Sequence, residues 1–171
     1  MDYLWTPWRS TYMEANRTSN ECVFCLAAQD PANDEASLVV YRGENCFVIL
    51  NRYPYTSGHL MVVPYAHVSK LDLASKASTG EIMELAREAE QVLESVYKPD
   101  GLNLGMNIGS AAGAGIAQHL HLHVLPRWSG DANFMTAVGK TRVIPEALED
   151  TYRKLKKRFT ERLSGGSAAP R

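Results

Sequence analysis

The stretch Gln118-His-Leu-His-Leu-His-Val-Leu-Pro126 decides how the rest of the chain is interpreted. Side chains alternate between two faces along a β-strand. A strand here would place His119, His121 and His123 on one face and apolar side chains on the other. The apolar face suits a protein core, but three adjacent imidazoles are polar, titrate near neutral pH and gain nothing from burial. The row of histidines therefore predicts a functional site.

The histidine row alone leaves two kinds of site open. Imidazole is a common metal ligand, so the row could hold one metal ion, as in a three-histidine metalloenzyme. Imidazole is also a nucleophile, so one ring could form a covalent intermediate while its neighbours set its charge and tautomer. The small-residue loop just upstream, from Gly109 to Gly115, favours the second alternative. Glycine backbone amides there can approach an anion such as phosphate closely.

Length, composition and charge bound the class of protein. The 171 residues fit one domain, and 45% hydrophobic with 22% charged residues is a globular mixture. The net charge of −1 gives no overall basic field for a nucleic-acid backbone. The apolar runs are far shorter than the roughly 20 residues of a membrane helix, and the N-terminus lacks the basic start and apolar stretch of a signal peptide. We therefore expect a cytoplasmic protein with no nucleic-acid or membrane partner.

The hydrophobic pattern predicts an α+β fold. Short apolar segments predict strands over residues 37–42, 46–51, 58–64, 102–108 and 118–125. Apolar residues at helical spacing predict a helix over 79–96, capped by Ser78 or Thr79, and a second helix that begins at Pro145. Such elements are typical of a five-stranded, mainly antiparallel sheet with a long crossover helix and a C-terminal helix.

The chain divides into three segments. Residues 1–20 are expected to form an aromatic N-terminal arm without a clear hydrophobic period. Residues 21–164 are expected to form a single domain that includes a polar loop over 28–36, and residues 165–171 a disordered tail. The edges of a short sheet and an apolar arm both need cover, which predicts a homodimer or a higher homo-oligomer.

The histidine stretch resembles the signature of the histidine triad (HIT) family, H-φ-H-φ-H-φ-φ, where φ is a hydrophobic residue. Asn51, the stretch 57–64 and His67 stand where the second and third strands of that family and the following loop would be. The resemblance covers roughly residues 20–128. It implies a HIT-like fold and a nucleotide substrate.

The resemblance also implies roles for individual residues. His121 corresponds to the nucleophile, which would attack an α-phosphorus and carry the nucleotidyl group on its ring. His123 corresponds to the histidine beside the bound phosphate, and His59 to the one that orients the cluster. Asn51 would bind the ribose, and Asn107, Gly113 and Gly115 would bind phosphate oxygens.

A C-x-x-C pair, Cys22 and Cys25, is typical of a metal or redox pair in a chain without an export signal, although both could be buried thiols. Several triad relatives hold a structural zinc ion with such a pair, a histidine and the first triad histidine. The resemblance thus implies Zn²⁺ bound by Cys22, Cys25, His67 and His119, a closed tetrahedral set that removes His119 from catalysis. Cys46 is expected to be a small core hydrophobe.

The segments at 4–9 and 126–134 are similar to bacterial triad proteins related to diadenosine tetraphosphate phosphorylases. The implied activity is cleavage of dinucleoside polyphosphates, such as diadenosine tetraphosphate, by a nucleotidyl hydrolase or transferase. In the phosphorylases the loop before the triad carries a serine beside its glycine, whereas Gly113-Ala114-Gly115 has no hydroxyl and Ser110 is the only one in the loop. That departure favours water over inorganic phosphate as the acceptor.

Three alternatives stay open beside this hydrolase. They are a phosphorylase that uses inorganic phosphate, a nucleoside phosphoramidate hydrolase, and a nucleotide-binding regulatory protein with little turnover. The basic side of the C-terminal helix is expected to face solvent. The functional alternative is that it contacts long anionic substrates or RNA.

Overall fold

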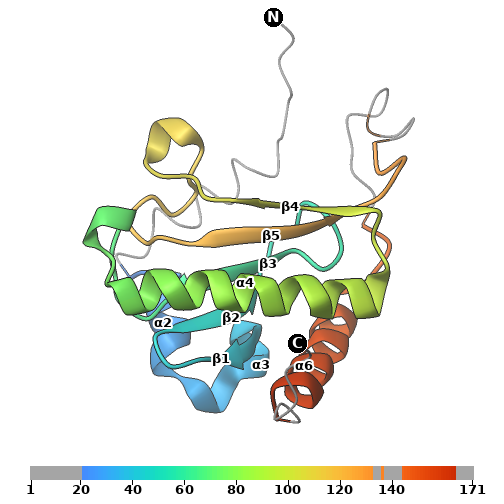
Figure 1. Cartoon of the computed structure of the whole chain (residues 1–171), viewed down its shortest axis with the longest axis horizontal. Helices are drawn as coiled ribbons and strands as arrows, with labels where there is room; N and C mark the ends of the chain where they lie inside the picture. Colours follow the sequence, from blue (N-terminus) through green and yellow to red (C-terminus); the bar gives the residue numbers. More distant parts are fainter. Residues whose placement is uncertain (1–20, 133–135, 137–143, 165–171) are drawn as a thin grey trace, which may run out of the picture.

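The computed structural model describes residues 21–132, 136 and 144–164, which form a five-stranded sheet with helices packed on it (Figure 1). The strands are β1 (Val39–Arg42), β2 (Cys46–Leu50), β3 (Leu60–Pro64), β4 (Gly101–Gly105) and β5 (Leu122–Arg127). Their order across the sheet is β1-β2-β3-β5-β4, and every neighbouring pair is antiparallel. The predicted fold class is confirmed.

The central strands place the last triad histidine in the middle of the sheet. All residues of β2 and β3 are buried. β5 lies between β3 and β4, so that His123 faces Met61 of β3 on one side and Gly105 of β4 on the other. A backbone paired on both sides holds this ring in a fixed position.

The long helix α4 (Lys76–Tyr97) crosses one face of the sheet (Figure 1). Its buried apolar residues recur at helical spacing, as predicted: Ile82, Leu85, Ala86, Ala89, Val92 and Leu93. The predicted cap at Ser78 or Thr79 is wrong, because the side chain of Ser75 accepts from the backbone amide of Ser78 and the helix begins at Lys76. The first turn carries no large apolar side chain, so the hydrophobic pattern could not reveal it.

The C-terminal helix α6 (Leu148–Ser164) begins three residues after Pro145 and packs against α4 and β1. The ring of Phe159 stacks on Tyr41 of β1 with centroids 6.0 Å apart. The basic side chains of α6 pair with carboxylates, for example Lys154 with Glu146. This pairing is what a solvated face would show.

The segment predicted as a polar loop over 28–36 contains short helices. They are the end of α2 (Val23–Gln29), the 3₁₀ turn η1 (Pro31–Asn33) and α3 (Asp34–Ser37), which also takes the first residue of the predicted first strand. An isolated helix as short as α2 is not stable in water, so its stability has to come from contacts outside the helix.

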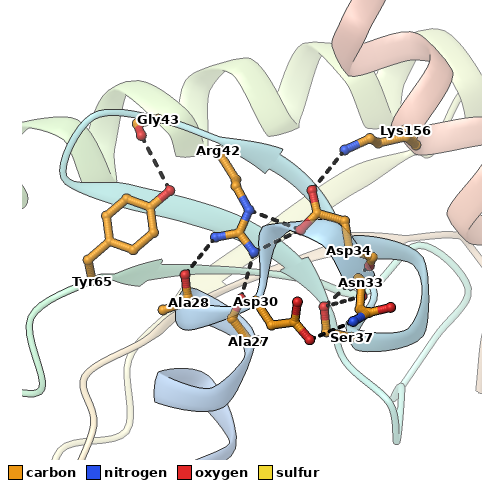
Figure 2. Close-up of polar contacts among 10 residues, drawn as sticks. All are labelled: Ala27, Ala28, Asp30, Asn33, Asp34, Ser37, Arg42, Gly43, Tyr65 and Lys156. Atoms are coloured by element: carbon orange, nitrogen blue, oxygen red, sulfur yellow. Dashed lines mark hydrogen bonds and ion pairs between the residues drawn. The ribbon is translucent and has the colours of Figure 1, made fainter.

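Arg42 supplies such contacts from the end of β1 (Figure 2). Its guanidinium donates to the carbonyl oxygens of Ala27 and Ala28 at 2.6 and 3.1 Å, and thereby satisfies the C-terminal end of α2. The same group donates to Oδ1 of Asp34 at 2.8 and 2.9 Å, while Lys156 of α6 binds Oδ2. Arg42 therefore fixes the segment from α2 to α3 to the sheet.

Cys46 is fully buried in the core, as expected. In the part of the chain that the structure describes, no helix combines the length and apolarity needed to cross a membrane. The predicted arm and tail, at residues 1–20 and 165–171, lie outside the described residues, and the domain boundaries stay a prediction.

Candidate active site

A pocket of about 570 Å³ lies between the α2–α3 segment and the triad histidines, and we call it the main pocket. Six of the predicted catalytic and substrate-binding residues line it: Asn51, Asn107, Gly113, Gly115, His121 and His123. The seventh, His59, is completely buried behind His123. The structure thus brings together residues from four separate stretches of sequence.

The histidine stretch does not form one continuous strand. β5 begins only at Leu122, so the prediction of a strand from residue 118 is wrong for its first four residues. The backbone amide of Leu120 donates to Val68 in a loop at 2.6 Å instead of to a neighbouring strand. As a result His119 turns away from the main pocket, whereas His121 and His123 line it.

The hydrogen bonds around His59 determine the tautomers of two rings. The backbone amide of Tyr55 donates to Nδ1 of His59 at 3.2 Å, so the proton of His59 is on Nε2. That nitrogen donates to Nδ1 of His123 at 2.9 Å, which leaves the proton of His123 on its own Nε2. Burial, with the neighbouring histidines as a smaller cause, lowers the pKa of His59 to about 3 and that of His123 to about 4. Both rings are therefore neutral at pH 7.

The ring of His121 has the opposite tautomer. Its Nδ1 lies 2.8 Å from the carbonyl oxygen of His119, which can only accept, so the proton is on Nδ1 and Nε2 keeps its lone pair. Burial lowers the pKa of His121 and outweighs the hydrogen bond to that carbonyl, which raises it. A neutral imidazole with a free Nε2 in a pocket is a suitable nucleophile.

The glycine loop forms another wall of the main pocket. Gly113 has φ of +89° at the end of the 3₁₀ turn η3 (Ser110–Ala112), a conformation that favours glycine. Gly113 and Gly115 line the pocket, whereas Ser110 is exposed and is absent from the lining. The hydroxyl of this loop therefore lies outside the pocket.

Gly58 explains why a glycine precedes His59. Its φ is +79°, and a Cβ there would lie 2.9 Å from a ring carbon of Tyr97. Any other residue would have to adopt a strained conformation and displace that ring.

His119 belongs to a second cluster, formed with Cys22, Cys25 and His67 and here called the Cys–His cluster. Its Nε2 donates to the carbonyl oxygen of Pro64 at 2.9 Å, which directs Nδ1 toward the sulfur atoms of Cys22 and Cys25 at 3.3 and 3.6 Å. Nδ1 of His67 lies 3.2 Å from Cys25 Sγ, and the four ligand atoms are all within 4.8 Å of one another.

These residues fit a tetrahedral metal ion. With bonds of about 2.3 Å to sulfur and about 2.0 Å to nitrogen, zinc would set neighbouring ligand atoms roughly 3.5 Å apart. Although burial raises it, the hydrogen bond with His119 and those from backbone amides lower the pKa of Cys22 to about 6, which favours the thiolate that a metal requires. A metal ion would replace the hydrogen bond between Cys22 and His119.

The sequence analysis missed two residues that contact the histidines of the site. Phe24 stands inside the C-x-x-C pair, and its ring lies 5.3 Å from that of His119 and 5.2 Å from that of His121. Its position between two candidate ligands was a usable signal. Tyr55 acts on His59 through its backbone amide, which no side-chain pattern can reveal.

Comparison with known proteins identifies the class to which this fold and site belong. The HIT domain model matches residues 32–130, and the chain belongs to the histidine triad (HIT) family. It is 42% identical over 158 residues to the protein named AP-4-A phosphorylase of Mycobacterium tuberculosis, an alignment that covers 89% of this chain and 81% of that protein.

Two solved structures are also similar. One is a Zn-bound histidine triad family protein from Mycobacterium smegmatis, with 28% identity and a TM-score of 0.68 over 86% of this chain and 98% of the other. The other is a hypothetical histidine triad nucleotide-binding protein from Sulfolobus tokodaii, with 28% identity and a TM-score of 0.66 over 87% of this chain and all of the other.

Proposed function

We propose that the protein cleaves dinucleoside polyphosphates, such as diadenosine tetraphosphate, through a nucleotidyl group held covalently on His121. The observation that carries the proposal is the ring of His121, whose Nδ1 is fixed by a carbonyl oxygen while Nε2 is unprotonated in the main pocket. Family membership and the 42% identity to a protein named AP-4-A phosphorylase support the substrate class.

The first step is displacement at an α-phosphorus. Nε2 of His121 forms a bond to phosphorus, and the bond from phosphorus to the bridging oxygen breaks, so that the rest of the substrate leaves as a nucleotide. Nε2–H of His123 is available to donate to a phosphate oxygen, and backbone amides near Gly113 and Gly115 stabilise the added negative charge. Asn51 is assigned to the ribose and Asn107 to the phosphate.

In the second step an acceptor attacks the same phosphorus, and the bond to Nε2 breaks. Two displacements in sequence retain the configuration at phosphorus. Water is the acceptor that the loop favours, because Ser110 lies outside the lining of the main pocket and Gly113-Ala114-Gly115 has no hydroxyl. Inorganic phosphate is the second candidate, favoured by the name of the relative from M. tuberculosis.

Product analysis on diadenosine tetraphosphate, with and without inorganic phosphate, tests both the activity and the acceptor. AMP and ATP in both conditions would establish hydrolysis. ADP and ATP that depend on added phosphate would establish phosphorolysis. Absence of any cleavage would contradict the proposal and favour a regulatory nucleotide-binding protein.

We also propose that the Cys–His cluster holds a structural Zn²⁺. The ligand atoms suit a closed tetrahedral shell, and a Zn-bound family member has a similar fold. When bound, the ion would fix α2 to the loop that precedes β5. His119 would be one of the zinc ligands. Its backbone carbonyl oxygen accepts a hydrogen bond from Nδ1 of His121 and thereby orients that ring.

A homodimer is the assembly we propose. In the described part of the chain, β4 pairs only with β5, so its other edge is open, whereas β1 at the opposite end of the sheet packs against α6 and α3. Leu104 on β4 and Ile108 just after it are 46% and 39% exposed. Pairing of two β4 edges would satisfy the backbone and cover these side chains.

A further inference from the structure

The main pocket extends along α2 from the histidines to a polar turn. Phe24 near the N-terminal end of α2 contacts the ring of His121. Asp30 follows directly after the helix, six residues further on and therefore about 9 Å along the axis. Asp30 and Asn33 both line the pocket, so the helix spans a nucleoside-sized distance between the histidines and this turn.

The wall between the two ends is apolar. Val23 and Leu26 are 42% and 46% exposed although their side chains are hydrophobic, and both line the pocket. Ala27, Ile49 and Met61 line it as well. Apolar side chains exposed within a pocket are suited to the faces of a flat aromatic ring.

The polar turn carries a negative charge and unused acceptors. Nδ2 of Asn33 donates to Oδ2 of Asp30 at 2.7 Å (Figure 2). Within the described residues, Oδ1 of Asp30 and Oδ1 of Asn33 accept no hydrogen bond, and Asn33 has a second amide hydrogen to donate. A carboxylate repels phosphate, so the phosphates of a substrate belong at the histidine end and its base at the Asp30 end.

Contacts with the sheet hold this turn in place. Arg42 binds the carbonyl oxygens of Ala27 and Ala28 on one side of the turn and the carboxylate of Asp34 on the other (Figure 2). A turn fixed at both ends presents its polar groups without a further loss of conformational entropy on binding, which favours selectivity.

We propose that Asp30 and Asn33 read the base and select a 6-aminopurine over a 6-oxopurine, an inference that rests on the proposed function. The amino group of adenine donates to Oδ1 of Asp30, and Nδ2 of Asn33 can at the same time donate to N7, which lies on the same edge of the ring. On that edge hypoxanthine has only acceptors, O6 and N7, so its O6 would face the carboxylate of Asp30 without a proton between them, while its N1–H lies on the other side of the ring.

Binding of AMP and IMP by isothermal titration calorimetry tests the proposal, because the two nucleotides differ chiefly at the reading position. We expect the zinc-loaded wild-type protein to bind AMP at least about tenfold more tightly than IMP. The ratio should fall below about threefold in Asp30→Ala/Asn33→Ala. Glu35→Ala is the matched control, since Glu35 is a neighbouring exposed carboxylate on α3 outside the lining, and it should keep the wild-type ratio.

Equal affinities of the wild-type protein for AMP and IMP would overturn the proposal and leave the proposed function intact. An unchanged ratio in the double variant would also overturn it, since other groups would then read the base. Binding of neither nucleotide would contradict the proposed function itself, and the base selection with it.

Discussion

Three different groups determine which ring nitrogen carries the proton in His59, His121 and His123. A backbone amide at Tyr55 determines the tautomer of His59, the ring of His59 determines that of His123, and the carbonyl oxygen of His119 determines that of His121. These partners make His121 the ring with a free Nε2. The sequence pattern treats the three triad residues as equivalent, so it could identify the cluster but not the proton on each ring.

Burial of neutral histidines makes stability depend on pH. The unfolded chain binds protons on histidine near pH 6.5, whereas the folded pKa values are about 3 for His59 and about 4 for His123. Unfolding therefore takes up protons below pH 6.5, and the free energy of unfolding is highest above that pH and falls as the pH is lowered toward 4. At about 1.4 kcal/mol per proton and pH unit, we expect a loss of roughly 2–3 kcal/mol between pH 7 and 5.5 in urea unfolding with excess zinc.

The variant His59→Gln provides the control for this prediction. Glutamine can donate to His123 but does not titrate, so about half of the loss should disappear. The same pH dependence in the variant and the wild-type protein would show that the loss comes from other groups.

At the scale of elements, the helix α2 connects both sites. It begins at the Cys–His cluster, contributes Phe24 to the histidine rings and ends at the turn held by Arg42. Its C-terminal end is held by Arg42, a side chain of β1, and a metal ion in the Cys–His cluster would hold its N-terminal end. The predicted loop over 28–36 contains the end of α2, η1 and α3, which are too short and polar to show a helical hydrophobic pattern, whereas the longer α4 shows one and was predicted correctly over most of its length.

Loss of the metal should affect stability more than chemistry. In Cys22→Ser, zinc measured by mass spectrometry should fall from one ion per chain to well below one, and the melting temperature should drop, because metal-binding free energy contributes to folding. The rate of the chemical step per folded molecule should fall less, since Cys22 does not line the main pocket.

Cys46→Ala is the matched cysteine variant. Cys46 lies in the core and outside the cluster, so its substitution should leave the zinc content unchanged. Absence of zinc from wild-type protein purified without a chelator would refute the assignment. An unaltered metal content and melting temperature in Cys22→Ser would refute it equally.

For the whole molecule, short apolar segments and turn residues predicted all five strands and the antiparallel sheet, because the central strands β2 and β3 are buried apolar runs. The candidate site could be predicted where a motif carries it, as at His121 and Cys22. The reading of the base by Asp30 could not, since it depends on how β1 and α2 pack. The boundaries at residues 118–121 were wrong because Leu120 pairs with a loop and not with a strand.

The proposed dimer has a direct test in solution. The wild-type chain of 19.0 kDa should show about twice that mass by light scattering at micromolar concentration. Leu104→Asp on the open edge of β4 should shift the mass to that of one chain. Met83→Asp, at a position 59% exposed on α4, should leave it unchanged. A wild-type mass near 19.0 kDa would contradict the dimer.

The covalent step on His121 is tested most directly by trapping the intermediate. After rapid acid-free quenching of a reaction with diadenosine tetraphosphate, peptide mass spectrometry should find an adenylyl group on His121. His121→Asn should bind AMP within a few fold of the wild-type affinity, carry no label and lose at least about a hundredfold of the turnover. Label on another residue, or a variant that retains more than about a hundredth of the wild-type turnover, would contradict His121 as the nucleophile.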